Sequence, residues 1–528
     1  MTATHPAGSR KSRRDVRPLL LTAGEAVQLV RSGSTLAVEG SGGGVVEPTA
    51  LLEALGTRSA GGEPRDLTLV FCAGIGDKDG SGLDHLARPG VLKRAIGGHY
   101  GMNPGLSALV ASGAIEAFNF PQGVLAQMYR EVAAGRPGVL TRVGLGTFCD
   151  PRLDGGRLSG GPTEGLVSVL EVDGREWLLY RAVPIDYAFI RATTSDQRGN
   201  LTMEHEVASL SVLALAMACH NSGGTVIAQV ERLAAGHALK TRDVVVPGHL
   251  VDVVVVAPGT PQTIVGQYEP GLSGEFRAPL EAIPTLPANE RTVIARRAAA
   301  EITRGAVVNV GVGMADGVPA ILLEENRLDD VVLTVEQGLS GGVPAQGVIF
   351  GAVWNPESVI DAPSQFDFFD GGGLDVACLG FAEVDSLGNV NASRVGDAVF
   401  GAGGFINISQ SARRVVFCGT LTAGGLVTRL GQGRITIERE GQHRKFVDRV
   451  RHMTFSAAQA RSSGQGVMYV TERAVFELEE RGPVLVEIAP GLDLERDVLA
   501  HMAFRPAIAD PLRTMAPELF RFPAERRS

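Results

Sequence analysis

The sequence predicts an α/β protein made of two related open, mostly parallel α/β domains. Short apolar runs of strand-forming residues alternate with helical apolar patterns, which is typical of a parallel sheet covered by helices on both faces. Residues 31–52 and 304–323 repeat one arrangement, in which an apolar strand leads through a glycine-rich turn to a proline that opens a helical pattern. A chain of 528 residues is long enough to give each copy its own core.

The first predicted domain covers residues 19–270. A basic stretch over residues 1–18 precedes it, and we expect this stretch to be a disordered tail because it lacks the apolar segment of a secretory signal. The apolar stretch 210–218 is too short to cross a membrane and indicates a buried helix. Runs of β-branched and other apolar residues predict strands at 35–38, 67–71, 187–190, 226–230 and 251–256.

The second predicted domain covers residues 290–528 and follows a linker over residues 271–289 that contains several prolines and glycines. It opens with a helical pattern over residues 291–304. The same reasoning as in the first domain predicts strands at 307–310, 331–335, 376–379, 414–417, 467–470 and 484–487.

Composition excludes several classes of protein. A net charge of −9 argues against nucleic acid as a partner, and without an apolar run of about 18 residues we expect no membrane span. The five cysteines are scattered, have no metal-ligand spacing and lie mostly in apolar segments, so we expect reduced core cysteines in a cytoplasmic protein without a metal. The 68 glycines exceed the usual share of about 7% and cluster in loops after strands.

Glu336 is the most informative residue of the chain. Five strand-forming residues, 331–335, lead directly to this carboxylate, and glycine-rich chain follows it. Ligands of open α/β sheets bind beyond the carboxyl ends of the strands, and a carboxylate is costly to bury there without a function. Alternatively, Glu336 is a helix N-cap or a turn acid. The internal repeat places Cys72 at the matching position of the first half, which suggests that the two halves share a site to which one contributes the carboxylate.

Other loops give weaker signals. Residues 311–317 read GxGxxxG, which misses the dinucleotide-binding spacing by one residue and is explained equally well by a tight turn. The asparagines of residues 385–393 could cap a turn or donate to a developing oxyanion, and the glycine loop 401–404 could be structural or offer its N–H groups to a ligand. His99 is interpreted as a structural residue or a pocket wall.

Several further segments form an ordered set with the Glu336 segment, namely residues 119–123, 196–200, 371–380, 388–391, 401–405 and 486–497. As a set they resemble the family I CoA-transferases, in particular the single-chain group that includes acetate, 3-oxoacid and propionate CoA-transferases. The resemblance covers residues 19–512 and implies two domains of the CoA-transferase type, the first like the α subunit and the second like the β subunit of two-chain relatives.

The resemblance implies that CoA moves from a short-chain acyl-CoA to an acceptor such as acetate, propionate, butyrate or a 3-oxoacid. Glu336 would be the nucleophile, forming first an acyl-glutamyl anhydride and then a glutamyl-CoA thioester. Asn391 and the backbone of Gly404 would stabilise the oxyanion, with Asn389 as a competing donor. CoA would be a substrate, with no further cofactor, and relatives suggest a homodimer or homotetramer. The residues expected to border the substrate or CoA are Gln122, Gly341, Gly342, Gly401 and Gly403.

Four alternatives remain open at this point. An acyl-CoA hydrolase could use the same glutamate with water as the acceptor. A sugar-phosphate isomerase or deaminase shares the fold but not the ordered glutamate and glycine loops. A non-catalytic acyl-CoA-binding subunit would tolerate loss of Glu336, and a nicotinamide dehydrogenase rests only on the imperfect glycine loop.

Overall fold

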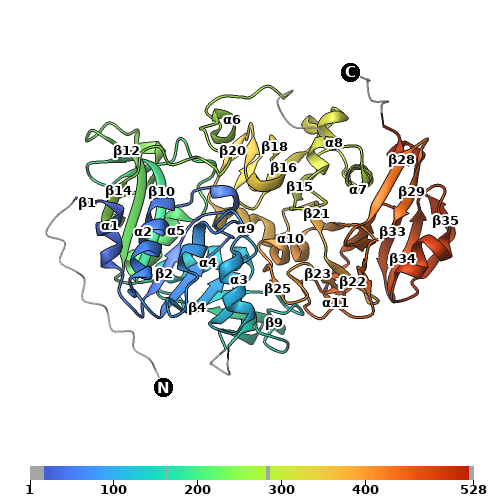
Figure 1. Cartoon of the computed structure of the whole chain (residues 1–528), viewed down its shortest axis with the longest axis horizontal. Coiled ribbons are helices and arrows are strands. Elements are labelled where there is room, and N and C mark those ends of the chain that lie inside the picture. Colours follow the sequence, from blue (N-terminus) through green and yellow to red (C-terminus); the bar gives the residue numbers. More distant parts are fainter. Residues whose placement is uncertain (1–16, 161–164, 281–285, 523–528) are drawn as a thin grey trace.

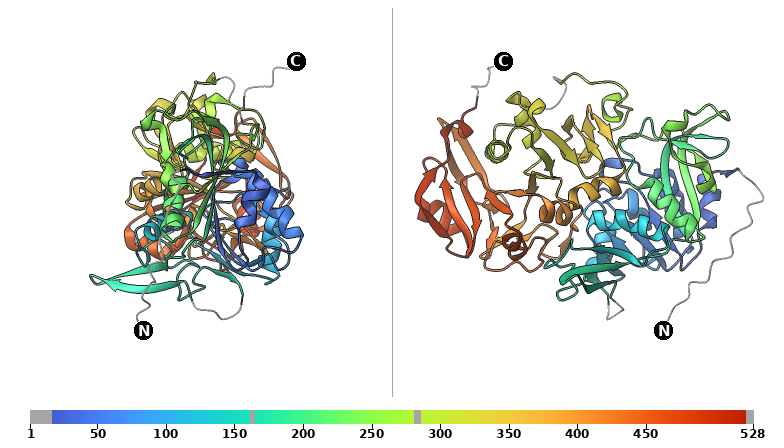
Figure 2. Two further views of the ribbon diagram at one scale, coloured as in Figure 1. Left: turned by 90° about the vertical axis from the view of Figure 1, so that its left-hand side faces the viewer. Right: turned by 180° about the vertical axis from the view of Figure 1, so that it is seen from behind.

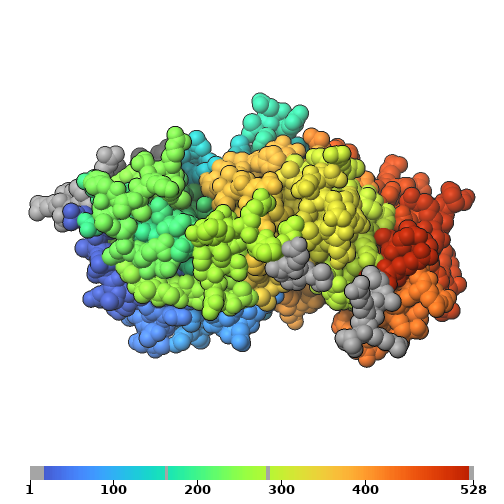
Figure 3. Space-filling model, turned by 90° about the horizontal axis from the view of Figure 1, so that it is seen from above, coloured from blue at the N-terminus to red at the C-terminus, as the bar shows by residue number. Residues whose placement is uncertain are grey.

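The computed structural model describes residues 17–160, 165–280 and 286–522, and its two halves lie side by side along the long axis (Figures 1 and 3). Each half contains one large sheet with helices packed on it, so the predicted class of two mostly parallel α/β domains is confirmed. The predicted tail lies outside the described residues except for Arg17 and Pro18, as do residues 281–285 of the predicted linker. No helix in the described ranges is long and apolar enough to cross a membrane.

The first sheet has the strand order β1-β14-β12-β10-β2-β3-β4-β5-β7, with every neighbouring pair parallel except β5 and β7. In that order the strands are Leu19–Leu21, Val253–Val256, Thr225–Ala234, Tyr187–Asp196, Thr35–Val38, Leu67–Phe71, Leu92–Gly97, Glu116–Asn119 and Arg157–Ser159. The helices of this half are α1 (Ala23–Ala26), α2 (Thr49–Ala60), α3 (Pro104–Ala111), α4 (Gln122–Ala133), α5 (Val212–Asn221) and α6 (Pro270–Ser273).

The second sheet has the order β20-β17-β16-β15-β21-β26-β32-β33-β34-β35, and its five central strands, β16 to β32, are parallel. In that order the strands are Ser358–Val359, Leu339–Ser340, Val332–Val335, Val307–Val310, Val376–Gly380, Arg414–Cys418, Gly466–Val470, Ala474–Glu479, Gly482–Ile488 and Ala507–Thr514. The helices are α7 (Glu290–Ala299), α8 (Val318–Glu324), α9 (Ala362–Asp370), α10 (Phe405–Ser411) and α11 (Ala457–Ser463).

The two sheets share a strand topology, in agreement with the internal repeat of the sequence. The segment β14-β12-β10-β2-β3 of the first sheet has the same chain order, spatial order and parallel direction as β32-β26-β21-β15-β16 of the second. Cys72 directly follows β3 and Glu336 directly follows β16, so the two residues occupy equivalent strand ends, as the sequence predicts.

Each half also contains smaller sheets beside its main sheet. In the first half, the long hairpin of β8 (Val167–Val172) and β9 (Arg175–Arg181) pairs with β6 (Gly138–Thr141) and projects from the body (Figure 2). In the second half, β22 (Glu383–Asp385) pairs with β23 (Val390–Asn391) and with β31 (Phe446–Val447), and β28 (Val427–Gly431) pairs with β29 (Arg434–Arg439). Cys72 and Glu336 both lie at the carboxyl ends of central parallel strands of their sheets.

Candidate active site

Glu336 lies where the sequence places it, immediately beyond the carboxyl end of β16 and before the short strand β17. The residue is partly buried, and its Oε2 atom is enclosed without a hydrogen-bond partner among the described residues. An enclosed, unpartnered carboxylate oxygen is unfavourable in a folded protein, so its presence at a ligand-binding edge needs an explanation beyond folding.

Burial destabilises the charged form of this carboxyl group relative to its neutral form. Burial raises the pKa of Glu336 above its ordinary value, and hydrogen bonding from its own N–H and from the amides of Gln337 and Asn309 opposes the rise without cancelling it. A carboxylate that is poorly solvated is also a better nucleophile than one surrounded by water, because less solvent must be removed when it attacks. The site therefore holds a carboxylate whose charged form is destabilised by its surroundings.

Two side-chain amides flank the carboxylate. Asn309 is fully buried in β15 and donates through Nδ2 to the carbonyl of Thr334, 3.2 Å away. Gln337 is buried and donates through Nε2 to Ser41 Oγ of the first half at 3.3 Å. The amide oxygens of both side chains have no partner among the described residues. Neither residue was predicted from the sequence, although an asparagine inside the apolar strand 307–310 and a glutamine next to Glu336 were available signals.

The glycine loop 401–404 lies beside the carboxylate. A Cβ atom on Gly404 would lie 3.5 Å from both Cβ and Cγ of Glu336, so the backbone here lies close to the glutamate side chain. Among the described residues, no acceptor is bonded to the Gly404 N–H, whose residue precedes the first turn of α10. The structure thus places Gly404, one of the predicted site residues, beside Glu336.

The first half holds this loop in position. Gly403 donates to the carbonyl of Gly98 at 2.8 Å, and the Gly403 carbonyl accepts from the N–H of Gln122 at 2.8 Å. Ala402 donates to Asn119 Oδ1 at 2.8 Å, and Asn119 Nδ2 donates in turn to the carbonyls of Gly97 and Gly98.

Close packing explains Gly401, and a positive φ explains Gly403. Gly401 has a φ of +83°, and a Cβ there would lie 2.9 Å from Gly98 O. Gly403 has a φ of +53°, a conformation that favours glycine. Predicted site residues Gln122, Gly401 and Gly403 therefore meet across the boundary between the two halves.

His99 and Cys72 lie near this boundary but do not offer a second reacting group. His99 lies beside Gly401, and burial, with a contribution from the charge of Lys78, lowers the pKa of His99 to about 4, so its imidazole is neutral at pH 7. Burial raises the pKa of the Cys72 thiol well above its ordinary value, so the residue equivalent to Glu336 stays protonated.

The geometry does not support Asn391 as an oxyanion donor. Asn391 Nδ2 donates to Glu383 Oε2 at 2.8 Å and to the Arg394 carbonyl at 2.6 Å, so both amide hydrogens are used within a turn of the second half. The side-chain amide of Asn389 is also bonded within the second half, because its Nδ2 donates to Asp385 and its Oδ1 accepts from Ala457 N. The sequence correctly indicated a polar turn here, and the alternative that these asparagines cap it is the one the contacts favour.

Gly341 and Gly342 are needed for the path of the backbone. Both have positive φ angles, +76° and +67°. A Cβ on Gly342 would lie 2.2 Å from Trp354 O, and one on Gly341 would lie 2.5 Å from Cγ of Glu357. Close packing within the second half accounts for these glycines, and their predicted place along the CoA arm stays a prediction.

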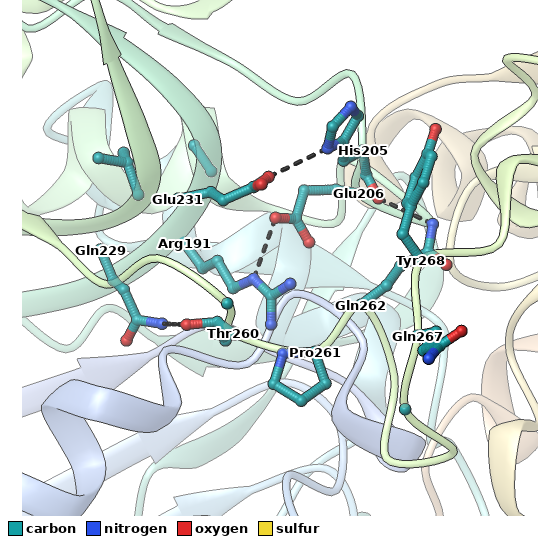
Figure 4. A pocket seen from close by; sticks show the side chains of 14 residues that line it. Arg191, His205, Glu206, Gln229, Glu231, Thr260, Pro261, Gln262, Gln267 and Tyr268 are labelled. Atoms are coloured by element: carbon teal, nitrogen blue, oxygen red, sulfur yellow. Dashed lines mark hydrogen bonds and ion pairs between the residues drawn. The ribbon is translucent and has the colours of Figure 1, made fainter.

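A pocket of about 530 Å³ in the first half does not include any predicted site residue (Figure 4). It lies by β10 and β12, and its polar groups are largely paired with one another. Arg191 forms a buried ion pair with Glu206, and His205 Nδ1 lies 3.0 Å from Glu231 Oε2. This pocket is therefore a weaker candidate site than the edge that carries Glu336.

Replacing Glu336 by Gln is expected to raise the melting temperature near neutral pH. The raised pKa contributes stability that is fully present below the unfolded carboxyl pKa of about 4.3 and is lost as pH rises through the folded value. The amide has no such loss, so the melting temperature of the variant relative to wild type should increase as pH rises from the unfolded carboxyl pKa through the folded pKa of Glu336. Thermal unfolding at several pH values measures this, and a difference that is constant with pH would contradict the unfavourable burial of the carboxylate.

The fold and the site together define a two-domain α/β protein with an enclosed carboxylate at the edge where such sheets bind ligands. A family described as coenzyme A transferase matches residues 20–257. Acetate CoA-transferase YdiF of Escherichia coli K12 is 44% identical over 503 residues, 95% of this chain and 95% of the relative. Caffeate CoA-transferase of Acetobacterium woodii is 42% identical over 509 residues, 95% of this chain and 97% of the relative. The chain belongs to the coenzyme A transferase family.

Solved structures agree with this assignment. The YdiF apoenzyme of Escherichia coli O157:H7 has a TM-score of 0.93 and 43% identity, with 98% of each chain covered. The thioester complex of the same protein with CoA has a TM-score of 0.92 and 43% identity, covering 97% of this chain and 98% of YdiF.

Proposed function

We propose that this CoA-transferase moves CoA from a short-chain acyl-CoA to an acceptor carboxylate, with Glu336 as the covalent nucleophile. The observation that carries the proposal is the enclosed Glu336 carboxylate, with an unpartnered Oε2 and the backbone of Gly404 against its side chain. Membership of the family supports the transfer of CoA, and the thioester complex described for YdiF supports a covalent step.

The reaction consists of two exchanges at the Glu336 carboxylate. The carboxylate attacks the thioester carbonyl and the C–S bond breaks. CoA departs as its thiolate, and an acyl-glutamyl anhydride is formed. The thiolate then attacks the glutamyl carbonyl, which releases the first carboxylic acid as its anion and forms a glutamyl-CoA thioester. An acceptor carboxylate reverses both steps, so a difficult exchange is divided into easier ones, and no proton has to be removed from the nucleophile.

Each attack places negative charge on a carbonyl oxygen next to Glu336. We assign stabilisation of this oxyanion to the Gly404 N–H, which has no acceptor among the described residues. One such donor contributes a factor of about 10² to 10³ in rate. Asn309 and Gln337 orient the carboxylate between turnovers, since their amides approach it, whereas Asn391 holds the turn in which its hydrogens are used.

The acids themselves are proposed from relatives. The name of YdiF gives acetate and that of the Acetobacterium woodii relative gives caffeate, so similar chains accept quite different acids. We propose acetate, propionate, butyrate or a 3-oxoacid as acceptors. A cytoplasmic location and a homodimer or homotetramer are part of the same proposal.

The deciding experiment is mass spectrometry of the protein after incubation with acetyl-CoA without an acceptor. A CoA-sized adduct on the peptide that contains Glu336 is expected, and labelled propionate added afterwards should remove it and yield propionyl-CoA. If the adduct is released at the same rate with and without a carboxylate, water is the acceptor and the protein is an acyl-CoA hydrolase. If no adduct forms under trapping conditions, the covalent role of Glu336 is wrong.

A further inference from the structure

The edge that carries Glu336 continues across the neighbouring parallel strands. Beyond β16 come β15, β21 and β26, and the residues that directly follow them are Gly311, Phe381 and Gly419. Parallel strands end at the same edge of a sheet, so a long substrate whose reactive end lies at Glu336 can extend along these positions. The CoA arm is such a substrate, with the thioester at one end and a pyrophosphate at the other.

Lys445 brings a positive charge to this edge. It lies between β30 (His443–Arg444) and β31, and its Nζ is 4.1 Å from the centroid of the Phe381 ring, in cation–π geometry. A Cβ on Gly419 would lie 2.7 Å from this Nζ, so the glycine leaves the space that the ammonium occupies. The ammonium is thus held where β21 and β26 end.

This ammonium lacks a bound counterion. Among the described residues it forms no ion pair, although the charge of Glu472 acts on it. The carboxylate of Glu472 is already used, because it accepts from Leu421 N at 2.9 Å and from Arg473 Nε. Burial lowers the pKa of Lys445 to about 8, which an anionic ligand would reverse. A partly buried cation without an anion is costly unless a ligand supplies one.

The spacing agrees with the length of the CoA arm. Neighbouring strands lie about 4.8 Å apart, so two to three intervals from β16 to the space between β21 and β26 amount to roughly 10–14 Å. About thirteen bonds separate the thioester sulfur of CoA from the first phosphorus, and at standard bond lengths this arm extends to about 16 Å at most. A slightly bent arm therefore spans the two places.

We propose that the Lys445 ammonium, held over Phe381 where β21 and β26 end, binds the pyrophosphate of the CoA substrate whose thioester reacts at Glu336. This inference rests on the function proposed above. Lys445 is accordingly a binding residue for the substrate and takes no part in the bond changes at Glu336.

The test compares thioesters that differ only in their phosphates. For Lys445→Met, kcat/KM with acetyl-CoA should fall about 10-fold to 100-fold, the usual loss for a charge-assisted contact. The loss should be as large with acetyl-3′-dephospho-CoA, which keeps the pyrophosphate, and absent with acetyl-pantetheine, which lacks it. Lys445→Arg should keep most of the activity, and Lys93→Met, at an exposed position of β4, serves as the matched control for loss of a lysine charge.

Each other outcome overturns the proposal in a distinct way. An equal loss with acetyl-pantetheine would show that Lys445 acts on the arm or on the fold. An undiminished rate with acetyl-3′-dephospho-CoA would assign the contact to the 3′-phosphate, and an undiminished rate with acetyl-CoA would exclude any contact. In all of these cases wild type still transfers CoA, whereas a wild-type protein inactive with every thioester would refute the proposed function itself.

Discussion

Replacing Glu336 by Gln or Ala is expected to lower kcat for CoA transfer by a factor on the order of 10⁴ or more, the scale seen when a covalent nucleophile is removed. The reason is geometric as well as chemical. The carboxylate lies close to the Gly404 backbone, and its Oε2 has no hydrogen-bond partner among the described residues. A Gln or Ala side chain has no carboxylate oxygen that could attack the thioester there. Initial rates of acyl exchange between acetyl-CoA and labelled propionate measure the effect.

Two further variants make this result specific. Glu336→Asp keeps the charge but withdraws it by one methylene, so it should retain partial activity above that of the Gln variant. Glu325→Gln removes an exposed carboxylate of the same domain and should leave kcat unchanged. If Glu336→Gln kept more than a tenth of the wild-type kcat, the carboxylate would not be the nucleophile.

Asn119→Ala is expected to lower kcat about 10²-fold, although Asn119 belongs to the first half and its side chain bonds to Ala402, Gly97 and Gly98 and not to Glu336. The substitution leaves the Ala402 N–H without its acceptor and frees the loop that carries Gly404 beside the carboxylate. A displacement of about 1 Å at a reacting centre costs a factor of this size. Steady-state kinetics should show the loss in kcat more than in KM for acetyl-CoA.

The matched control for this variant is Asn103→Ala. Asn103 is also fully buried, and its Nδ2 donates to Ile75 O at 2.6 Å within the first half. Both variants should lower the melting temperature, since each leaves buried polar groups unpaired, but only Asn119→Ala should lower kcat strongly. Equal kinetic losses would mean that general loosening of the first half, and not the glycine loop, limits the reaction.

The sequence predicted the strands that build the shared topology and missed those that depart from it. Strands β2, β3, β10, β12 and β14 have apolar β-branched runs, as do their counterparts in the second half, because both faces of each strand are covered. Strands β4 and β5 carry Lys, Arg and Glu and gave no such run. The helix expected over 291–304 ends at Ala299, where i→i−3 bonds from Glu301 and Ile302 tighten the chain into a turn.

Some residues of the candidate site could likewise be predicted from the sequence and others could not. Glu336 could be predicted because a single strand and a single carboxylate define its position, and the loop 401–404 because glycine patterns mark turns. A role for the amides of Asn309 and Gln337 could not be predicted, since it depends on which neighbour each side chain faces in the folded protein. The prediction for Asn391 has the same difficulty: whether its hydrogens are free depends on Glu383 and Arg394, and spacing in the sequence does not reveal these contacts.

The loop that touches Glu336 is fastened by hydrogen bonds whose other partners, Gly98, Asn119 and Gln122, belong to the opposite half. An active enzyme therefore forms only when both halves are correctly folded. A chain whose second half was intact but whose first half had folded late or wrongly would carry every reacting atom and still be inert. Conversely, we expect two separately made halves to regain activity if they dock, because these hydrogen bonds join Gly98, Asn119 and Gln122 directly to the glycine loop.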